Sequence, residues 1–422
     1  MLSTLKNAWK IPDLRKKLLY TLWIIVIFRL GAAIPVPGID KAKLAQMFAE
    51  SGEGLIGFFN LMSGGSFKNF TIFALGISPY ITASIIMNLL QIAIPALEEL
   101  SKQGEEGKKK MAQYTRYGTV TLALIQAFGF SFGIFRSAFV NPGMKSIAVS
   151  VITLTAGVAF LMYLGEKITE NGIGNGISLF IFAGIISRIP GGIISTFMKV
   201  QTGDVNLLSV ILFAAIAVAV VVGVSFIQEG KRKIPVQYAK RVIGRKMYGG
   251  QSTHIPLKVN QSGVIPVIFA MSLLMFPITV SQFWPQSGFY YFAKNYLNST
   301  SVLYNVLYAI LIMFFAYFYT SVTFNPVEVA KNMKKNGGYI PGIRPGRPTS
   351  EYLSKTLNRL TLAGAVFLAG IAILPNIILA LGTLQIRFGG TALLIAVGVS
   401  LETTKQIEAQ MMMRHRKGFL ND

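Results

Sequence analysis

The stretch Gly76–Ile81, which reads GISPYI, returns later in the chain as GVIPVI at Gly263–Ile268. Gly, Pro and the final Ile occupy the same offsets in both copies. Each copy lies at the start of a long apolar segment, the first copy in the second of ten segments and the second copy in the seventh. If the ten segments form two halves of five, each copy belongs to the second segment of its half. Segments interrupted by Gly and Pro at corresponding positions of two halves indicate a repeat whose working site lies at the repeat interface. Because each half contains an odd number of segments, the second half enters the membrane from the opposite side and the repeat is inverted.

A transmembrane helix needs about 20 predominantly apolar residues. Ten segments qualify, at residues 18–36, 70–94, 115–136, 147–165, 176–195, 207–227, 264–283, 303–323, 357–379 and 388–403. The sequence therefore predicts an all-α integral membrane protein with ten transmembrane helices in two inverted five-helix halves, residues 18–200 and 201–403. The basic N-terminus and the apolar run after it also resemble a secretory signal peptide, but the apolar pattern resumes directly after Arg29, which favours a retained first helix.

The composition agrees with a membrane protein and disfavours several classes of enzyme. Of the 422 residues, 52% are hydrophobic and 14% are charged, against about 25% charged in soluble domains. The chain has no cysteine and two distant histidines, which leaves no thiolate metal site, no disulfide and no candidate metal cluster. Phosphate-binding, serine-hydrolase and zinc-protease motifs are absent from the sequence. We therefore expect no cofactor, no metal and no enzymatic activity, and any energy for transport would come from a partner.

The distribution of basic residues orients the predicted helices. The chain carries 40 Lys and Arg against 17 Asp and Glu, for a formal net charge of +23. Most of the basic residues fall in the two termini and in the even-numbered loops. Cytoplasmic loops of membrane proteins carry an excess of Lys and Arg, so both termini, residues 1–17 and 404–422, are predicted to be cytoplasmic.

Two of the cytoplasmic loops, residues 228–262 and 324–356, are longer than a connection between helices requires. In the first, Val236, Tyr238, Val242 and Ile243 alternate with polar residues, which predicts a short hairpin. One interpretation of these loops is a solvated basic surface that touches anionic lipid. The other is an ordered docking site for a cytoplasmic partner or for RNA, which the Tyr, Ile and Pro residues among the charges favour.

Between the first two predicted spans lies GLIGFFNLMSGGSFKNF, Gly54–Phe70. Its apolar side chains are costly to expose to water, yet the Ser-Gly-Gly-Ser run at Ser63–Ser66 stops any helix after about three turns. The segment is thus too short to cross a membrane. The sequence predicts a short apolar helix over residues 54–66 that must be buried elsewhere.

Five long motifs resemble the bacterial SecY family, the channel subunit of the Sec protein translocon. In chain order they read GFFNLMSGGSFKNFTIFALGISPYITASIIMNLL, ITENGIGNGISLFIFAGI, YAKRVIGRKMYGGQSTHIPLKVNQSGVIPVIFA, NGGYIPGIRPGRPTSEYL and RFGGTALLI. The resemblance covers essentially the whole chain. It implies two halves around a central hourglass-shaped pore that passes unfolded preproteins across the plasma membrane and releases transmembrane segments sideways into lipid through a lateral gate.

The resemblance also implies roles for individual residues. The plug, a short helix that blocks the resting pore, falls on Leu55, Ile56, Phe58, Phe59, Leu61, Met62, Ser63, Gly64 and Gly65. The pore ring falls on Ile81, Ile85, Ile181, Ile268, Leu273 and Ile395, of which Leu273 departs from isoleucine. The lateral gate falls on Asn88, Gln91 and Phe276. The docking surface for the SecA ATPase and the ribosome falls on Lys240, Arg241, Arg245, Lys246 and Arg344.

The partners that the resemblance implies are the small membrane subunits SecE and SecG, SecA, the ribosome with its RNA, the signal sequences of preproteins, and lipid. Two rival functions are a secondary solute transporter with inverted repeats and a membrane scaffold that only recruits a cytoplasmic partner. Coupled transporters usually carry ionisable groups inside their spans, and the predicted spans here hold almost none, which disfavours the transporter.

Overall fold

A computed structural model of the chain describes residues 8–50, 60, 63–203, 205–238, 241–243, 246–248, 252–281, 284, 287–298, 301–380 and 390–418. The first half contains α2 (Pro12–Gly31), α3 (Lys41–Glu50), α5 (Ser78–Ala93), α6 (Pro95–Lys102), α7 (Glu105–Gly129), η1 (Phe130–Ile134), η2 (Phe135–Ala138), α8 (Met144–Asn171), α9 (Gly176–Ile186) and α10 (Ile189–Gln201). The second contains α11 (Leu207–Glu229), α12 (Ile265–Ser281), α13 (Gly288–Tyr296), α14 (Val302–Thr323), α15 (Pro326–Lys335), α16 (Arg347–Ala380) and α17 (Gly390–Gly418).

The two copies of the repeated motif fold alike. Gly76 and Gly263 both adopt left-handed backbone conformations, with φ of 57° and 63°, which glycine reaches without steric cost. A helix begins two residues after each of them, α5 in the first half and α12 in the second. Pro79 and Pro266 each take the second helical position, where a missing N–H removes no intrahelical bond.

Each predicted span overlaps one to three consecutive helices, although their bounds differ. Within the described part of the chain, six helices are long and apolar enough to cross a membrane, and a seventh is counted if α5 and α6, which meet at 101°, form one span. The second span begins later than predicted, at Ser78, because residues 71–77 form turns that lead to Gly76. The fifth is divided into α9 and α10 at residues 187–188, and Pro190 takes the second position of α10, where its missing N–H removes no intrahelical bond. At the other end of the chain, α17 continues to Gly418, so most of the predicted tail is helical.

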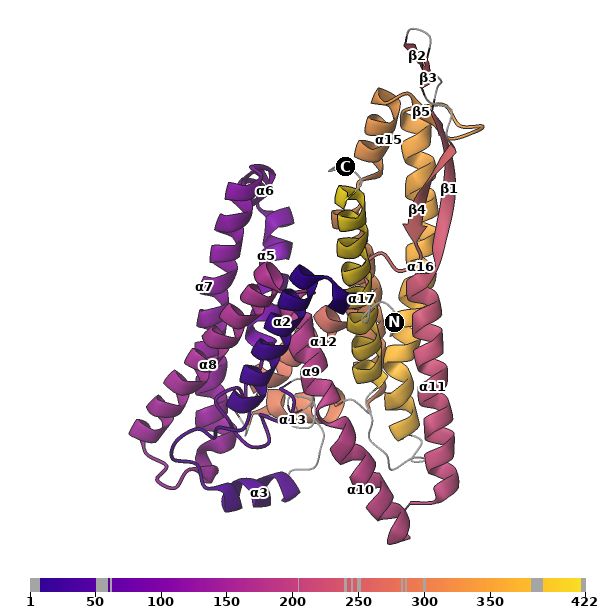
Figure 1. The fold of residues 1–422 in the computed structure, drawn as a ribbon. Coiled ribbons are helices and arrows are strands. Elements are labelled where there is room, and N and C mark those ends of the chain that lie inside the picture. Colours follow the sequence, from indigo (N-terminus) through magenta and orange to yellow (C-terminus); the bar gives the residue numbers. More distant parts are fainter. Residues whose placement is uncertain are drawn as a thin grey trace.

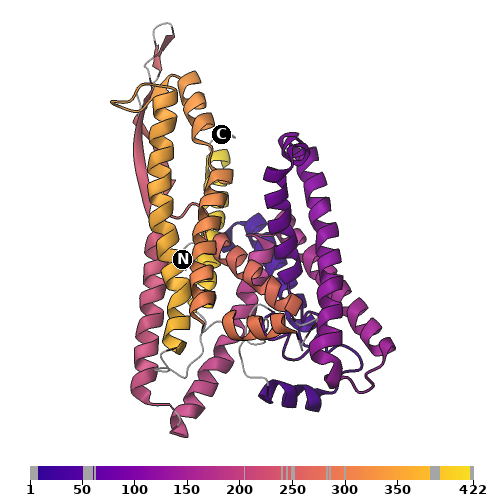
Figure 2. The same cartoon turned by 180° about the vertical axis from the view of Figure 1, so that it is seen from behind.

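The helices form two bundles that meet along two seams. In the first half α7 packs between α5 and α8, and in the second half α16 packs against α14 and α17. Between the halves, α12 contacts α5 and α7, and α9 contacts α17. Figures 1 and 2 show the two bundles from opposite sides, with α12 crossing between them. The largest core cluster contains side chains from both halves.

The two long basic loops come together in one small sheet. Strands β1 (Lys231–Tyr238) and β4 (Ser252–Lys258) of the first loop pair antiparallel, and β5 (Gly338–Tyr339) of the second loop pairs with β1. The expected hairpin is present as β2 (Arg241–Ile243) and β3 (Lys246–Tyr248). Val236 and Tyr238 do not belong to it, because they lie on β1. The sheet stands at the end of the molecule away from α3 and α10 (Figure 1).

Candidate functional site

Five isoleucines that the sequence singled out are buried in the core that the two halves share. Ile81 and Ile85 lie on α5, Ile181 on α9, Ile268 on α12 and Ile395 on α17. Each is at most 5% exposed, and all five belong to the largest apolar core cluster. These five residues are here called the isoleucine cluster. The residues come from four helices and from both halves. A ring of branched apolar side chains offers no hydrogen bonds to a passing chain and resists wetting when it is narrow.

Leu273, the sixth residue assigned to the ring, is more exposed than the other five. Its side chain is 38% exposed and does not belong to the core cluster that contains them. Ile177 on α9, which sequence reasoning missed, packs against that cluster. It stands one helical turn before Ile181, as Ile81 stands before Ile85, so both pairs occupy one helix face. This repeated spacing of four is the signal that could have identified Ile177.

The three residues assigned to the lateral gate lie on α5 and α12, the two helices that contact each other between the halves. Asn88 and Gln91 are half-buried on α5, and Phe276 is exposed on α12. The neighbouring Met275 is buried in a second apolar cluster together with residues of α7 such as Ala127. One side of α12 is thus held by the first half while Phe276 faces away from it. Pro277 lies inside α12 and removes one backbone hydrogen bond of the helix there.

The apolar segment over residues 54–66 is described only at Asn60 and from Ser63 onward. The predicted plug residues that lie outside the described part of the chain are Leu55, Ile56, Phe58, Phe59, Leu61 and Met62. Around the glycines, the Gly65 N–H donates to the carbonyl oxygen of Asn60 at 2.8 Å, and the Phe67 N–H donates to Ser63 Oγ at 2.9 Å. These bonds close a compact turn.

Gly64 in this turn is held by two other helices. Arg29 Nη1, at the end of α2, donates a hydrogen bond to the Gly64 carbonyl oxygen at 3.2 Å. A methyl group placed on Gly64 would lie 2.7 Å from the Gly184 Cα atom of α9. Gly64 has φ of 64°, in the left-handed region. A side chain at Gly64 would therefore prevent this close approach to the backbone of α9.

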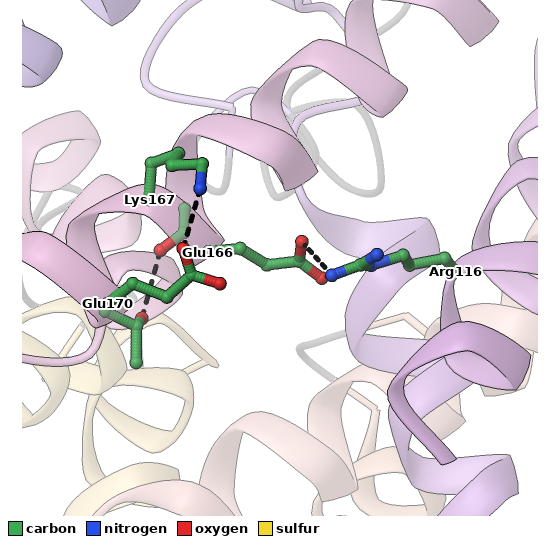
Figure 3. Close-up of polar contacts among 6 residues, drawn as sticks. Arg116, Glu166, Lys167 and Glu170 are labelled. Carbon is green, nitrogen blue, oxygen red and sulfur yellow. Dashed lines mark hydrogen bonds and ion pairs between the residues drawn. The ribbon is translucent and has the colours of Figure 1, made fainter. Parts of the chain in front are cut away.

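An ion pair joins the third and fourth spans. Arg116 on α7 meets Glu166 on α8 through two contacts, Nε to Oε1 at 2.9 Å and Nη2 to Oε2 at 2.8 Å. Figure 3 shows the two side chains pointing at each other, with the pair Lys167 and Glu170, whose Nζ and Oε2 atoms are 2.7 Å apart, beside them on α8. Two parallel contacts fix the orientation of a guanidinium more firmly than one.

Arg116→Ala is expected to lower the free energy of unfolding by about 0.5–1 kcal/mol, because the pair is partly exposed and links two helices. The matched control is Lys167→Ala, whose ion pair lies within one helix and whose loss should have a smaller effect. Thermal unfolding of the purified protein in detergent measures both. Equal shifts in Tm would show that the contact between α7 and α8 contributes nothing specific.

The docking residues assigned to the first basic loop lie on or beside the β2–β3 hairpin. Arg241 pairs with Tyr248, and Ile243 pairs with Lys246, in the backbone register of that hairpin. Lys240 and Arg245 lie outside the described residues. The structure thus places Arg241 and Lys246 on strands and tests none of the four as a contact site.

Arg344 in the second basic loop is exposed and lies between the turns at Pro341–Gly342 and Pro345–Gly346. Gly342 and Gly346 on either side of it have φ of 81° and 107°. The carbonyl oxygen of Arg344 accepts a hydrogen bond from Thr349 Oγ1 at 2.8 Å. Ile340, just before the turn, is buried in an apolar cluster with Val236 of β1 and other residues of the sheet. The backbone that carries Arg344 is therefore anchored on the sheet formed by the other loop.

Among the described residues, no group of three or more His, Asp or Glu could hold a metal ion. The functional features of the described chain are therefore an apolar centre, a seam between halves and a basic sheet.

Comparison with known proteins places these features in context. The family model named SecY matches residues 71–404. The protein translocase subunit SecY of Halalkalibacterium halodurans is 48% identical over 436 residues, which covers all of both chains. The chain is also similar to a solved structure of a SecY protein whose plug domain stabilises the closed state of the translocation channel. The TM-score is 0.69 at 22% identity, and the match covers 96% of each chain. Sec61 in a canine ribosome–channel complex has a TM-score of 0.65 at 21% identity, also with 96% coverage of each chain.

Proposed function

Since the chain belongs to the SecY family and is a subunit of a protein-conducting channel, we propose that its isoleucine cluster forms the constriction of the pore. The observation that carries this proposal is that Ile81, Ile85, Ile181, Ile268 and Ile395, from four helices of both halves, are all buried in one core cluster. Ile177 extends the constriction by one helical turn. Leu273 stays a prediction, and its exposure argues for a role outside the closed constriction.

The chain offers a direct test because it contains no native cysteine. A preprotein with one cysteine, stalled in the channel, should form a disulfide with Ile81→Cys, Ile268→Cys or Ile395→Cys under mild oxidation. The control is Val218→Cys on α11, which is 63% exposed on the outside of the bundle. Crosslinking at Val218→Cys that equals crosslinking at the isoleucines would contradict a central path.

We also propose that the turn at Gly64 is the hinge of a plug that seals the resting pore. What supports this is the double restraint on the turn, by the Arg29 hydrogen bond and by the close approach of Gly184. Both restraints come from the first half. A plug hinged there could leave the pore without separating from the bundle.

Gly64→Ala should raise the conductance of resting channels in planar bilayers. Alanine at this φ costs about 1–2 kcal/mol, and its methyl group would also push the hinge away from Gly184. Gly65→Ala is the matched control, because Gly65 has φ of 95° but no atom within 4 Å of the added methyl position. Deletion of residues 55–65 should give the largest leak. The hinge proposal fails if the two alanine variants leak equally.

The seam between α5 and α7 on one side and α12 and α14 on the other is the proposed lateral gate, with Asn88, Gln91 and Phe276 along it. A segment of ten Leu-like residues gains about 3–6 kcal/mol on entering the bilayer. That gain sorts apolar from polar segments without chemistry at the gate. The gate therefore only has to open.

The chain itself is proposed to be passive, with energy supplied by a cytoplasmic partner. We propose that the SecA ATPase and the ribosome dock on the basic sheet and on Arg344, with ribosomal RNA as one contact, and that SecE and SecG complete the complex. The solved Sec61 neighbour is a ribosome–channel complex, which supports the ribosome as a partner. The charge asymmetry supports cytoplasmic termini in a bacterial plasma membrane. Mass spectrometry of small chains that copurify in mild detergent tests the subunit assignment.

A further inference from the structure

The connection between α12 and α14 contains a short helix, α13, that is rich in aromatic residues. Tyr290 on α13 is half-buried. Among the described residues of this connection, the exposed aromatic side chains are Trp284, Phe289, Tyr291, Phe292 and Tyr296. Lys294 is the only charged residue of Gly288–Tyr296. A face of this kind is costly to leave in water.

The opposite face of α13 is already occupied. Ala293 and Leu297 are buried and form a small cluster with Ile278 of α12, and Leu307 of α14 packs against it. The N-terminus is capped by Ser287, whose Oγ accepts a hydrogen bond from the Tyr290 N–H at 3.2 Å. The helix is therefore fixed to the ends of two spans, and its aromatic face is held outward.

The surroundings of that face indicate what covers it. Helix α13 contacts α14, whose start also carries the exposed apolar residues Val302 and Val306. In a membrane protein the bilayer covers exposed apolar residues of this kind. The helix lies on the side of the molecule away from the basic sheet (Figures 1 and 2). Trp and Tyr gather at membrane–water interfaces because their rings have an apolar body and a polar edge.

We propose that α13 lies in the membrane interface opposite the basic loops, and that its aromatic face binds the phospholipid surface at the boundary of headgroups and acyl chains. Phe289 and Phe292 supply apolar contact, and Tyr291, Tyr296 and the Trp284 indole supply the hydrogen-bonding edges. Lys294 suits a phosphate group but is not needed for the assignment. The proposal requires only that the chain crosses a membrane, so it stands or falls separately from the pore assignment.

The test uses tryptophan fluorescence of the full-length protein in phosphatidylcholine vesicles. The chain has three tryptophans, so Trp9→Phe and Trp23→Phe leave Trp284 as the only indole. A second variant adds Trp284→Phe and Phe292→Trp, which moves the indole onto α13 itself. Lipids brominated high on the acyl chain should quench both indoles at least about two-fold more than lipids brominated near the terminal methyl. Aqueous iodide should quench both only weakly.

The matched control places the single indole on the basic sheet through Tyr339→Trp, where iodide should quench it and brominated lipid should not. Strong iodide quenching with no lipid quenching at Trp284 and at Phe292→Trp would overturn the proposal, because α13 would then face water. Stronger quenching by the deep bromines would place it in the hydrocarbon core and overturn it too. Quenching by neither agent would mean that protein covers the face, whether a second copy or a partner, and would also overturn it.

Discussion

Arg344→Glu is expected to abolish ATP-driven translocation of a preprotein into vesicles by SecA. The side chain is exposed on a loop between two turns, where Gly342 and Gly346 have positive φ and the backbone is anchored by Thr349 and by buried Ile340. A planar guanidinium on a loop anchored in this way presents its donors in a fixed direction, which suits an acidic partner. Charge reversal replaces that attraction by repulsion. Insertion into the membrane and assembly with small subunits should be largely unchanged.

Arg344→Lys separates charge from geometry. Lysine keeps the positive charge but loses the forked donors, and one charge-assisted hydrogen bond is worth about 1.5 kcal/mol or more, so translocation should fall about tenfold. Lys334→Glu is the control, since Lys334 is equally exposed on neighbouring α15 and should cost much less. Channel abundance is measured in parallel. Wild-type rates for both Arg344 variants would show that this loop is only a basic surface facing lipid.

Replacing an isoleucine of the constriction by asparagine is expected to open the resting channel. An unpaired amide buried in an apolar ring costs about 1–3 kcal/mol, and that cost vanishes when the pore is hydrated. For Ile81→Asn, Ile268→Asn or Ile395→Asn, the open population should therefore rise by about five- to 150-fold. Planar-bilayer conductance and export of preproteins with defective signal sequences should both increase.

The matched control for this prediction is Leu368→Asn. Leu368 is as buried as the isoleucines and belongs to the same core cluster, but it lies on α16 and is not among the residues assigned to the pore ring. Its substitution should destabilise the protein without raising leak. If the three isoleucine variants likewise lower only abundance, the isoleucines are ordinary core residues.

The sequence by itself determined the membrane class, the ten apolar segments and the two-half arrangement. These features are local, because hydrophobicity over about 20 residues and the offsets of Gly76 and Gly263 can be read along the chain. The comparisons confirm the family and the channel function that the five motifs indicated. The individual site residues stay predictions, although five of the six residues assigned to the ring are buried in the same core cluster.

Only the tertiary structure decided which distant residues meet. Nothing local in 228–262 or 324–356 shows that Gln237 pairs with Tyr339, because strand pairing depends on backbone groups whose partners lie about a hundred residues apart. Likewise, the exposure of Leu273 and the packing of Ile177 follow from how α12 and α9 are rotated against their neighbours, which an apolar segment with no polar face does not specify. In a uniformly apolar helix every face suits either lipid or protein, so packing alone selects the side chains that reach the centre.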